Sequence, residues 1–101
     1  MSVNLHLKLE VKKYEESKVQ EIIEALTQVI KEEGLESEFQ PAECKKDKDG
    51  NNMILVQSNP RYPVIISRSY VWIPQMQQRF ETAIAKVMQG CQVLFYGEDA
   101  D

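Results

Sequence analysis

The N-terminal segment alternates between apolar and polar residues, which predicts a strand with one buried face. Over Val3 to Lys13, valine or leucine occupies every second position as far as Val11, and the positions between are polar. Because successive side chains of a strand point to opposite faces, one face would lie on a core and the other in water. A strand of this kind is typical of an antiparallel or mixed sheet.

The next segment has the periodicity of an amphipathic helix. From Val19 to Ile30, apolar residues recur at intervals of three and four positions, which places them on one face. Ser17 followed by Gln20 predicts a capping box at the start of the helix, and Gly34 predicts its end.

Two acids, Glu32 and Glu33, then fall in the last turn of this helix, where the helix dipole favours cations. Two interpretations stay open. The acids belong either to an unoptimised solvent face or to an acidic patch kept for a partner.

Two strands and a hairpin turn are predicted after the helix. Residues 36–46 contain Pro41 and a single large apolar residue, Phe39, which predicts a short edge strand, because proline cannot donate to a ladder. Asp49-Gly50 predicts the turn, since these residues readily adopt positive φ angles. The run from Met53 to Gln57 predicts the buried strand that returns from it.

A segment rich in proline and aromatic residues follows, from Asn59 to Gln75. It holds three of the four prolines and the only tryptophan. Val64 to Trp72 predicts a strand, whose apolar pattern is broken at residues 67–69, so we expect a bulge or two short pieces there. Pro74 suits the first position of a second helix. Gly90 would end that helix, and its apolar stripe consists of Phe80, Ala83, Ile84, Val87 and Met88.

The last predicted strand covers Gln92 to Tyr96, and the whole order is β-α-β-β-β-α-β. This order predicts an α+β two-layer sandwich, ferredoxin-like or a variant, with two helices on one face of a mostly antiparallel sheet of four or five strands. At 101 residues we expect a single domain over residues 1–97. The acidic residues 98–101 are expected to form a frayed tail.

The distribution of charge and the reactive side chains limit the classes of function that the sequence supports. The net charge is −4, and twelve of the sixteen acids lie in residues 1–49, which favours a basic protein partner over nucleic acid. The single histidine, His6, and Cys91 are the only conceivable nucleophile and base pair, and we expect them to be a surface histidine and a structural thiol. No segment is apolar enough to span a membrane, and no secretory signal is evident, so we expect a cytoplasmic protein.

The sequence lacks the residues that a calcium loop or a phosphate-binding loop requires. The stretch from Asp47 to Asn52 looks like part of a calcium loop, but Ser58 stands where the closing glutamate belongs. The four glycines do not cluster into a phosphate-binding loop. We therefore expect no enzymatic activity, no cofactor and no metal. Cys44 and Cys91 are expected to be free thiols, with one disulfide between them as the alternative.

The aromatic segment allows two interpretations. Trp72 and Tyr70 fill the junction between a strand and the second helix, or Tyr62, Arg68, Tyr70 and Trp72 form an exposed rim of the type found in protein interfaces. Both can hold together, with Trp72 inside and Tyr70 outside. Stacking of single-stranded RNA on Arg61, Tyr62, Arg68, Tyr70 and Trp72 is a weaker alternative, because the third strand, MILVQ, has no aromatic residue.

In its overall profile the chain resembles the small immunity proteins of bacterial toxin and immunity pairs, including contact-dependent inhibition systems. The resemblance lies in the length, the acidity, the α+β pattern and the gathering of acids in one region. It implies tight binding to a cognate toxin, often a basic nuclease, whose active site or substrate path is occluded. The residues we expect to contact the partner are Glu32, Glu33, Glu36, Glu38, Asp47, Asp49, Arg68, Tyr70 and Trp72.

The alternative function is a small ferredoxin-like ligand-binding or regulatory domain that dimerises through its sheet. The polar face of the first strand, which carries His6, Lys8, Glu10 and Lys12, would then meet a second subunit. The region of Arg68 and Tyr70 would contact a small anion.

Overall fold

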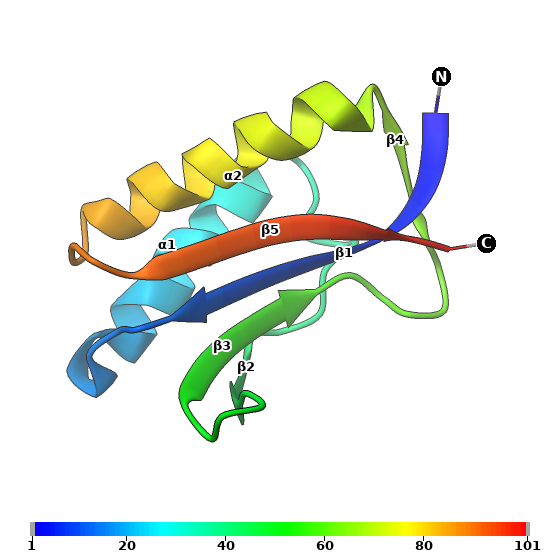
Figure 1. Cartoon of the computed structure of the whole chain (residues 1–101). Coiled ribbons are helices and arrows are strands. Elements are labelled where there is room, and N and C mark those ends of the chain that lie inside the picture. Colours follow the sequence, from blue (N-terminus) through cyan, green and yellow to red (C-terminus); the bar gives the residue numbers. More distant parts are fainter. Residues whose placement is uncertain (1, 101) are drawn as a thin grey trace.

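The computed structural model describes residues 2–100 and contains five strands and two α-helices in the predicted order (Figure 1). A short 3₁₀ turn, Glu16–Lys18, precedes the first helix. The elements are β1 (Ser2–Lys12), α1 (Val19–Glu32), β2 (Glu43–Lys46), β3 (Asn52–Gln57), β4 (Val64–Ser67), α2 (Ser69–Ala85) and β5 (Gln92–Asp99).

Strand β1 is the centre of a five-stranded antiparallel sheet. On one side it pairs with β5 over Leu5 to Lys12. On its other side it pairs with β3 through Lys8 to Lys12 and with β4 through Ser2 to Leu5. Strand β2 pairs with the outer side of β3. If β4 is set aside, the chain has the β-α-β-β-α-β order of ferredoxin-like domains, so the fold is a variant with one additional short strand.

Strands β3 and β4 behave as one long partner of β1 that a loop interrupts. Ser58, just after β3, still follows the ladder: its N–H donates to the Leu7 carbonyl at 2.9 Å, and its buried Oγ accepts from the Leu7 N–H at 2.8 Å. Residues 59–63 then leave the sheet opposite His6, and Val64 rejoins it opposite Leu5. The predicted strands on both sides of this loop are therefore present.

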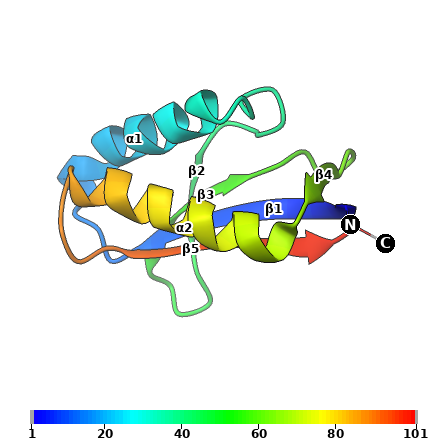
Figure 2. The ribbon, with the colours of Figure 1, turned by 90° about the horizontal axis from the view of Figure 1, so that it is seen from above.

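Both helices cover the same face of the sheet (Figures 1 and 2). The alternation in β1 has the predicted effect, because its apolar side chains from Leu5 to Val11 are at most 5% exposed. They meet the apolar stripes of α1 and α2, and Phe80 of α2 packs against Phe95 of β5 with ring centroids 5.2 Å apart. The core consists of these two layers, and the opposite face of the sheet is left uncovered by helices.

The boundaries of α1 and β2 differ in part from the prediction. Ser17 lies in the 3₁₀ turn, and no side chain caps the N-terminus of α1, so the predicted capping box is absent. Gly34 does end the helix, with a φ of 77° that suits glycine. The predicted strand over residues 36–46 is only Glu43–Lys46 long, because the segment before it contacts β3 through one isolated bridge, Phe39 to Ser58.

The start of α2 is the largest correction. Residues 70–72 were predicted as strand but are helical, because Arg68 adopts a left-handed conformation and α2 begins at Ser69. Pro74 accordingly lies inside the helix and not at its first position. The helix ends at Ala85, so Val87, Met88 and Gly90 lie beyond it. The spacing of Trp72, Met76, Phe80 and Ile84, four residues apart, is the signal that marks this helix.

The C-terminal strand is longer than predicted. β5 continues through Glu98 and Asp99, which stand opposite His6 and Leu5, and the N–H of Ala100 donates to the Asn4 carbonyl at 3.1 Å. The prediction of a frayed tail over residues 98–101 is therefore wrong as far as residue 100. Asp101 lies outside the described residues.

Phe80 provides a test of this packing, because it is fully buried between α2 and β5. We expect Phe80→Ala to lower the free energy of unfolding by about 3–5 kcal/mol, from lost burial and the cavity left behind. Urea denaturation measures the change. The matched control Gln78→Ala, on the exposed side of the same helix, should change stability by no more than about 0.5 kcal/mol. Equal effects of the two changes would contradict the assigned core.

Candidate functional site

The acids predicted to contact a partner fall into two groups at opposite ends of α1. Glu32 and Glu33 lie at its C-terminal end. The β2–β3 hairpin, which carries Asp47 and Asp49, lies at the other end, where Asn52 donates a hydrogen bond to Glu16. A helix of 14 residues is about 21 Å long. The acids of residues 32–49 are therefore not one continuous patch.

Glu32 and Glu33 connect the two helices. Arg79 of α2 pairs with Glu33 and, through Nη2, with Glu32 Oε1 at 3.3 Å. The Trp72 indole N–H also donates to Glu33 Oε1 at 3.3 Å. These contacts explain why two acids are tolerated at a helix C-terminus, since the guanidinium offsets the unfavourable dipole. Both carboxylates have partners within the chain.

Asp47 shapes the hairpin turn. Its Oδ1 accepts from the backbone N–H groups of Asp49 and Asn51, both at 2.9 Å, and Lys12 Nζ lies 3.5 Å from Oδ2. The hydrogen bond from Asn51 is the largest cause of a lowered pKa of this carboxyl. Asp47 thus has a local structural role, which is common for aspartate in turns.

The other predicted acids are available to solvent. Glu36, Glu38 and Asp49 are exposed, and none of them forms an ion pair with the residues that the structure describes. Glu36 and Glu38 lie in the connection between α1 and β2.

Trp72 and Tyr70 have different environments, although they are two positions apart. Trp72 is partly buried and meets Phe95 edge to face, with centroids 5.7 Å apart. Its position supports the structural interpretation of this residue. Tyr70 is 79% exposed. The aromatic residues of the segment therefore do not form one base-stacking platform on the sheet.

Exposed apolar and basic side chains occur on β4 and on the residues that flank it in sequence. Arg61 and Tyr62 precede the strand, Ile65 lies in its middle, and Arg68 and Tyr70 follow it; we call these five residues the β4–α2 surface. Tyr62 is 66% exposed and Ile65 is 70% exposed. The strand between the two arginines is four residues long, or about 13 Å. Neither arginine is ion-paired to an acid among residues 2–100.

Only part of this surface was evident from the sequence. Arg68 and Tyr70 were predicted contacts, Tyr62 was predicted as part of an exposed rim, and Arg61 was considered only for RNA. Ile65 lies within the strand predicted from Val64, but only its neighbours Val64 and Ile66 are buried, and its exposure was not foreseen. Three consecutive branched residues carry no alternation, so the exposed one is not distinguishable by pattern.

Arg68 has a strained backbone. Its φ and ψ are 52° and 49°, a region that glycine and asparagine occupy more readily than arginine. The turn ends β4, and the Arg68 carbonyl accepts the N–H groups of Val71 and Trp72 at 2.9 and 3.0 Å. Strained residues held in place by their surroundings concentrate at functional sites.

The open face of the sheet carries charges that pair within the chain. Lys8 Nζ lies 2.6 Å from Glu98, and Lys45 Nζ lies 3.2 Å from Glu43. The Tyr96 hydroxyl donates to Glu10 at 2.6 Å. Burial, followed by the Glu10 carboxylate, raises the pKa of Tyr96 to about 12. These charges already have partners, so the face does not require a second subunit to satisfy them.

His6 and Cys91, the base and nucleophile considered from the sequence, lie far apart in the structure. His6 stands opposite Glu98, whereas Cys91 precedes Gln92, which stands opposite Lys12. Six residues of strand, about 20 Å, separate the two positions. Nδ1 of His6 is buried without a hydrogen-bond partner in the described part of the chain. The two residues therefore cannot act together in catalysis.

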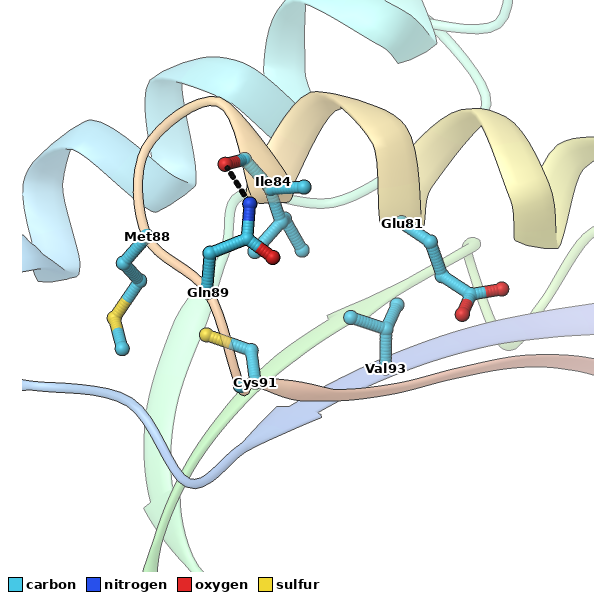
Figure 3. Close-up of a pocket in the computed structure, with 8 residues that line it drawn as sticks. Glu81, Ile84, Met88, Gln89, Cys91 and Val93 are labelled. Atoms are coloured by element: carbon cyan, nitrogen blue, oxygen red, sulfur yellow. Dashed lines mark hydrogen bonds between the residues drawn. The ribbon is translucent and has the colours of Figure 1, made fainter.

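Cys91 lines a small cavity at the C-terminal end of α2 (Figure 3). The cavity has a volume of about 220 Å³, and Ile84, Met88 and Val93 contribute to its wall. Burial raises the pKa of the Cys91 thiol, which lowers its thiolate fraction and its reactivity. Cys44 and Cys91 are both free thiols, so the predicted thiol state holds and the disulfide alternative does not.

Within residues 2–100, no three histidine, cysteine or acidic side chains lie close enough together to hold a metal ion. Neither described helix is long and apolar enough to cross a membrane.

Relief of the strain at Arg68 is measurable. We expect Arg68→Gly to raise the free energy of unfolding by about 0.5–1 kcal/mol, because the gain from removing a left-handed arginine exceeds the entropic cost of glycine. Arg61→Gly is the control, since Arg61 has an ordinary φ, and it should not stabilise. Denaturation curves showing that Arg68→Gly destabilises as much as Arg61→Gly would contradict the assigned strain.

Tyr96 makes stability depend on alkaline pH. Its pKa is raised from 10.0 to about 12 in the folded chain, so its contribution to stability is complete below about pH 10 and is lost as pH rises toward 12. We expect unfolding free energy to fall less steeply over this range in Tyr96→Phe than in the wild type. Glu10→Gln should lower the pKa of Tyr96 in a titration of tyrosinate absorbance. An unchanged titration in Glu10→Gln would contradict the assignment.

Little similarity to known proteins is found for this chain. No family model and no curated protein matches the sequence. A solved structure described as a conserved protein from Methanosarcina mazei Go1 is similar over 93% of this chain and 92% of that chain, with 9% sequence identity and a TM-score of 0.45.

Proposed function

We propose that this protein is a non-catalytic protein-binding domain and that the β4–α2 surface is its principal contact. The observation that carries the proposal is the presence of two arginines without ion-pair partners in the described chain beside three exposed tyrosine and isoleucine side chains. Tyrosine and arginine contribute disproportionately to binding energy in protein interfaces. Tyr62, Ile65 and Tyr70 are also among the large apolar side chains that the fold leaves exposed, and such side chains favour a binding site.

The strained turn at Arg68 supports the same surface. A glycine there would hold the turn at lower cost, and a strained non-glycine residue of this kind favours a functional role for its side chain. Its left-handed φ of 52° lies between β4 and α2, two regular elements that hold the turn. A rigid support of this kind lowers the entropy lost when a partner binds.

A second candidate is a toxin-neutralising immunity protein that contacts a basic partner through acids. What favours it is the exposure of Glu36 and Glu38, which have no ion pair in the part of the chain that the structure describes, together with the net charge of −4. What weighs against the larger predicted patch is that Glu32, Glu33 and Asp47 already have partners. Trp72 likewise belongs to the core boundary and not to this contact.

The alternative of a ligand-binding domain that dimerises through its sheet has less support. Such a dimer would bury Lys8, Glu10 and Lys45, whose charged groups are already paired within the chain. Burying paired charges costs desolvation energy and returns little new interaction.

Site-specific photo-crosslinking tests the proposal. A photoreactive phenylalanine analogue is placed at Tyr70, at Glu38 and at Gln89, which is exposed beyond the far end of α2, and crosslinked proteins are identified in cells that produce the chain. We expect a discrete partner to crosslink from Tyr70 and not from Gln89. Arg68→Glu should abolish that product while circular dichroism stays unchanged.

The other outcomes decide between the candidates. A basic partner that crosslinks from Glu38 and not from Tyr70 would favour the immunity function and contradict the β4–α2 surface. The same products from all three positions, or none from Tyr70, would also contradict it.

A further inference from the structure

The sheet has three strand edges, which are protected to different degrees against pairing with another chain. An edge strand exposes backbone N–H and C=O groups that can pair with another chain, and proteins usually protect them. In this molecule β5, β2 and β4 each pair with one neighbour only. Their outer sides can therefore be compared directly.

The outer side of β5 is covered by a side chain. Gln77 of α2 donates from Nε2 to the Val93 carbonyl at 2.6 Å, and its Oε1 accepts from the Phe95 N–H at 2.5 Å. The Gln77 amide thus makes the two hydrogen bonds that a neighbouring strand would make. This arrangement occupies the middle of β5 and blocks addition of a strand there.

Charged side chains protect the outer side of β2 against strand addition. The strand has only four residues, all exposed, and three of them are Glu43, Lys45 and Lys46. Short edge strands with lysine are a common protection against strand addition.

The outer side of β4 is as short as that of β2, at four residues, but β4 itself carries no charged residue, and no described side chain bonds to its outward backbone groups. The hydrogen bonds between Leu7 and Ser58 show that odd-numbered residues of β1 direct their backbone groups toward the β3 and β4 side. Backbone groups point alternately to the two sides of a strand. The N–H and C=O groups of Val64 and Ile66, which stand opposite Leu5 and Val3, therefore point toward β1. Ile65 and Ser67 therefore direct their N–H and C=O groups outward, and no element among residues 2–100 pairs with them.

The side chains around this edge indicate what it would accept. Ile65 is 70% exposed in the middle of the strand and offers an apolar contact to a residue on an added strand. Arg61 and Arg68 stand beyond the two ends of β4 without ion-pair partners in the described chain. They match acidic residues at both ends of an added segment.

A second copy of this chain is a poor occupant. Antiparallel pairing of two β4 strands would bring Arg61 of one copy near Arg68 of the other, and like charges across a strand pair are destabilising. The charges thus favour a different protein over self-association.

We infer that β4 binds an extended, acidic segment of a partner protein as an additional strand, through the backbone of Ile65 and Ser67. This inference rests on the proposed function and specifies its mode. Backbone hydrogen bonds supply affinity in this mode, and the side chains at alternate positions supply specificity. The segment would carry an apolar residue against Ile65 and acids against Arg61 and Arg68.

Selection from a displayed library of random peptides supplies the probe. We expect the peptides enriched on the full chain to be acidic at both ends with an apolar residue between, and to bind at least about tenfold more weakly to the Arg61→Glu, Arg68→Glu double variant. Lys48→Glu, a charge reversal at an exposed turn position, is the matched control and should leave binding unchanged. Failure to enrich acidic peptides, or equal loss in the control, would overturn the inference.

Amide exchange and backbone methylation then test whether the partner binds by strand addition. On addition of a selected peptide, amide exchange at Ile65 and Ser67 should slow while exchange at Val64 and Ile66 changes little. Peptides methylated at every second backbone nitrogen, in the register that faces β4, should lose binding, and those methylated in the other register should retain it. Equal binding of both methylated forms, or unchanged exchange at Ile65 and Ser67, would overturn strand addition.

The two proposals fail in different ways. If crosslinking from Tyr70 identifies a partner but amide exchange at Ile65 and Ser67 does not slow in the complex, the protein-binding function stands and strand addition is wrong. If Tyr70 gives no partner, the proposed function itself is wrong.

Discussion

The pairing of β1 on both sides is the constraint on which the structure depends. β5 lines one side, and β3 and β4 together line the other, so within residues 2–100 β1 alone pairs with three other strands. Its four apolar side chains from Leu5 to Val11 also form the floor on which both helices rest. A shift of β1 by one residue would turn this apolar row to the open face, so its alternation fixes the register of the whole sheet.

The sequence predicted those parts of the fold in which local pattern and tertiary burial agree. Alternation in β1, the stripe of α1 and the Asp49-Gly50 turn all have this property. The prediction was wrong for residues 70–72, because tyrosine, valine and tryptophan favour strands while the contact of Trp72 with Phe95 and the turn at Arg68 impose a helix. A left-handed arginine has no sequence signal, since arginine seldom adopts that conformation.

The candidate site was predictable only in part for a similar reason. Exposure of Arg68 and Tyr70 was one of two interpretations of the segment. The partners of Glu32, Glu33 and Asp47 depend on Arg79 and Lys12, which are distant in the sequence. Charge composition alone therefore overstated the acidic surface. Exposure of Ile65 and coverage of β5 by Gln77 depend on which strands lie at an edge, and that follows from topology and not from local pattern.

β3 and β4 pair with the same side of β1 as two separate strands, and this division determines where the chain can accept insertions. Each strand has its own register on β1, and residues 59–63 leave the sheet between them. The length of this loop is therefore independent of the pairing on both sides. Lengthening a surface loop costs little free energy, roughly 0.6 kcal/mol for each doubling. Insertions here would vary the residues presented beside β4 while the pairing of both strands and the core stay the same.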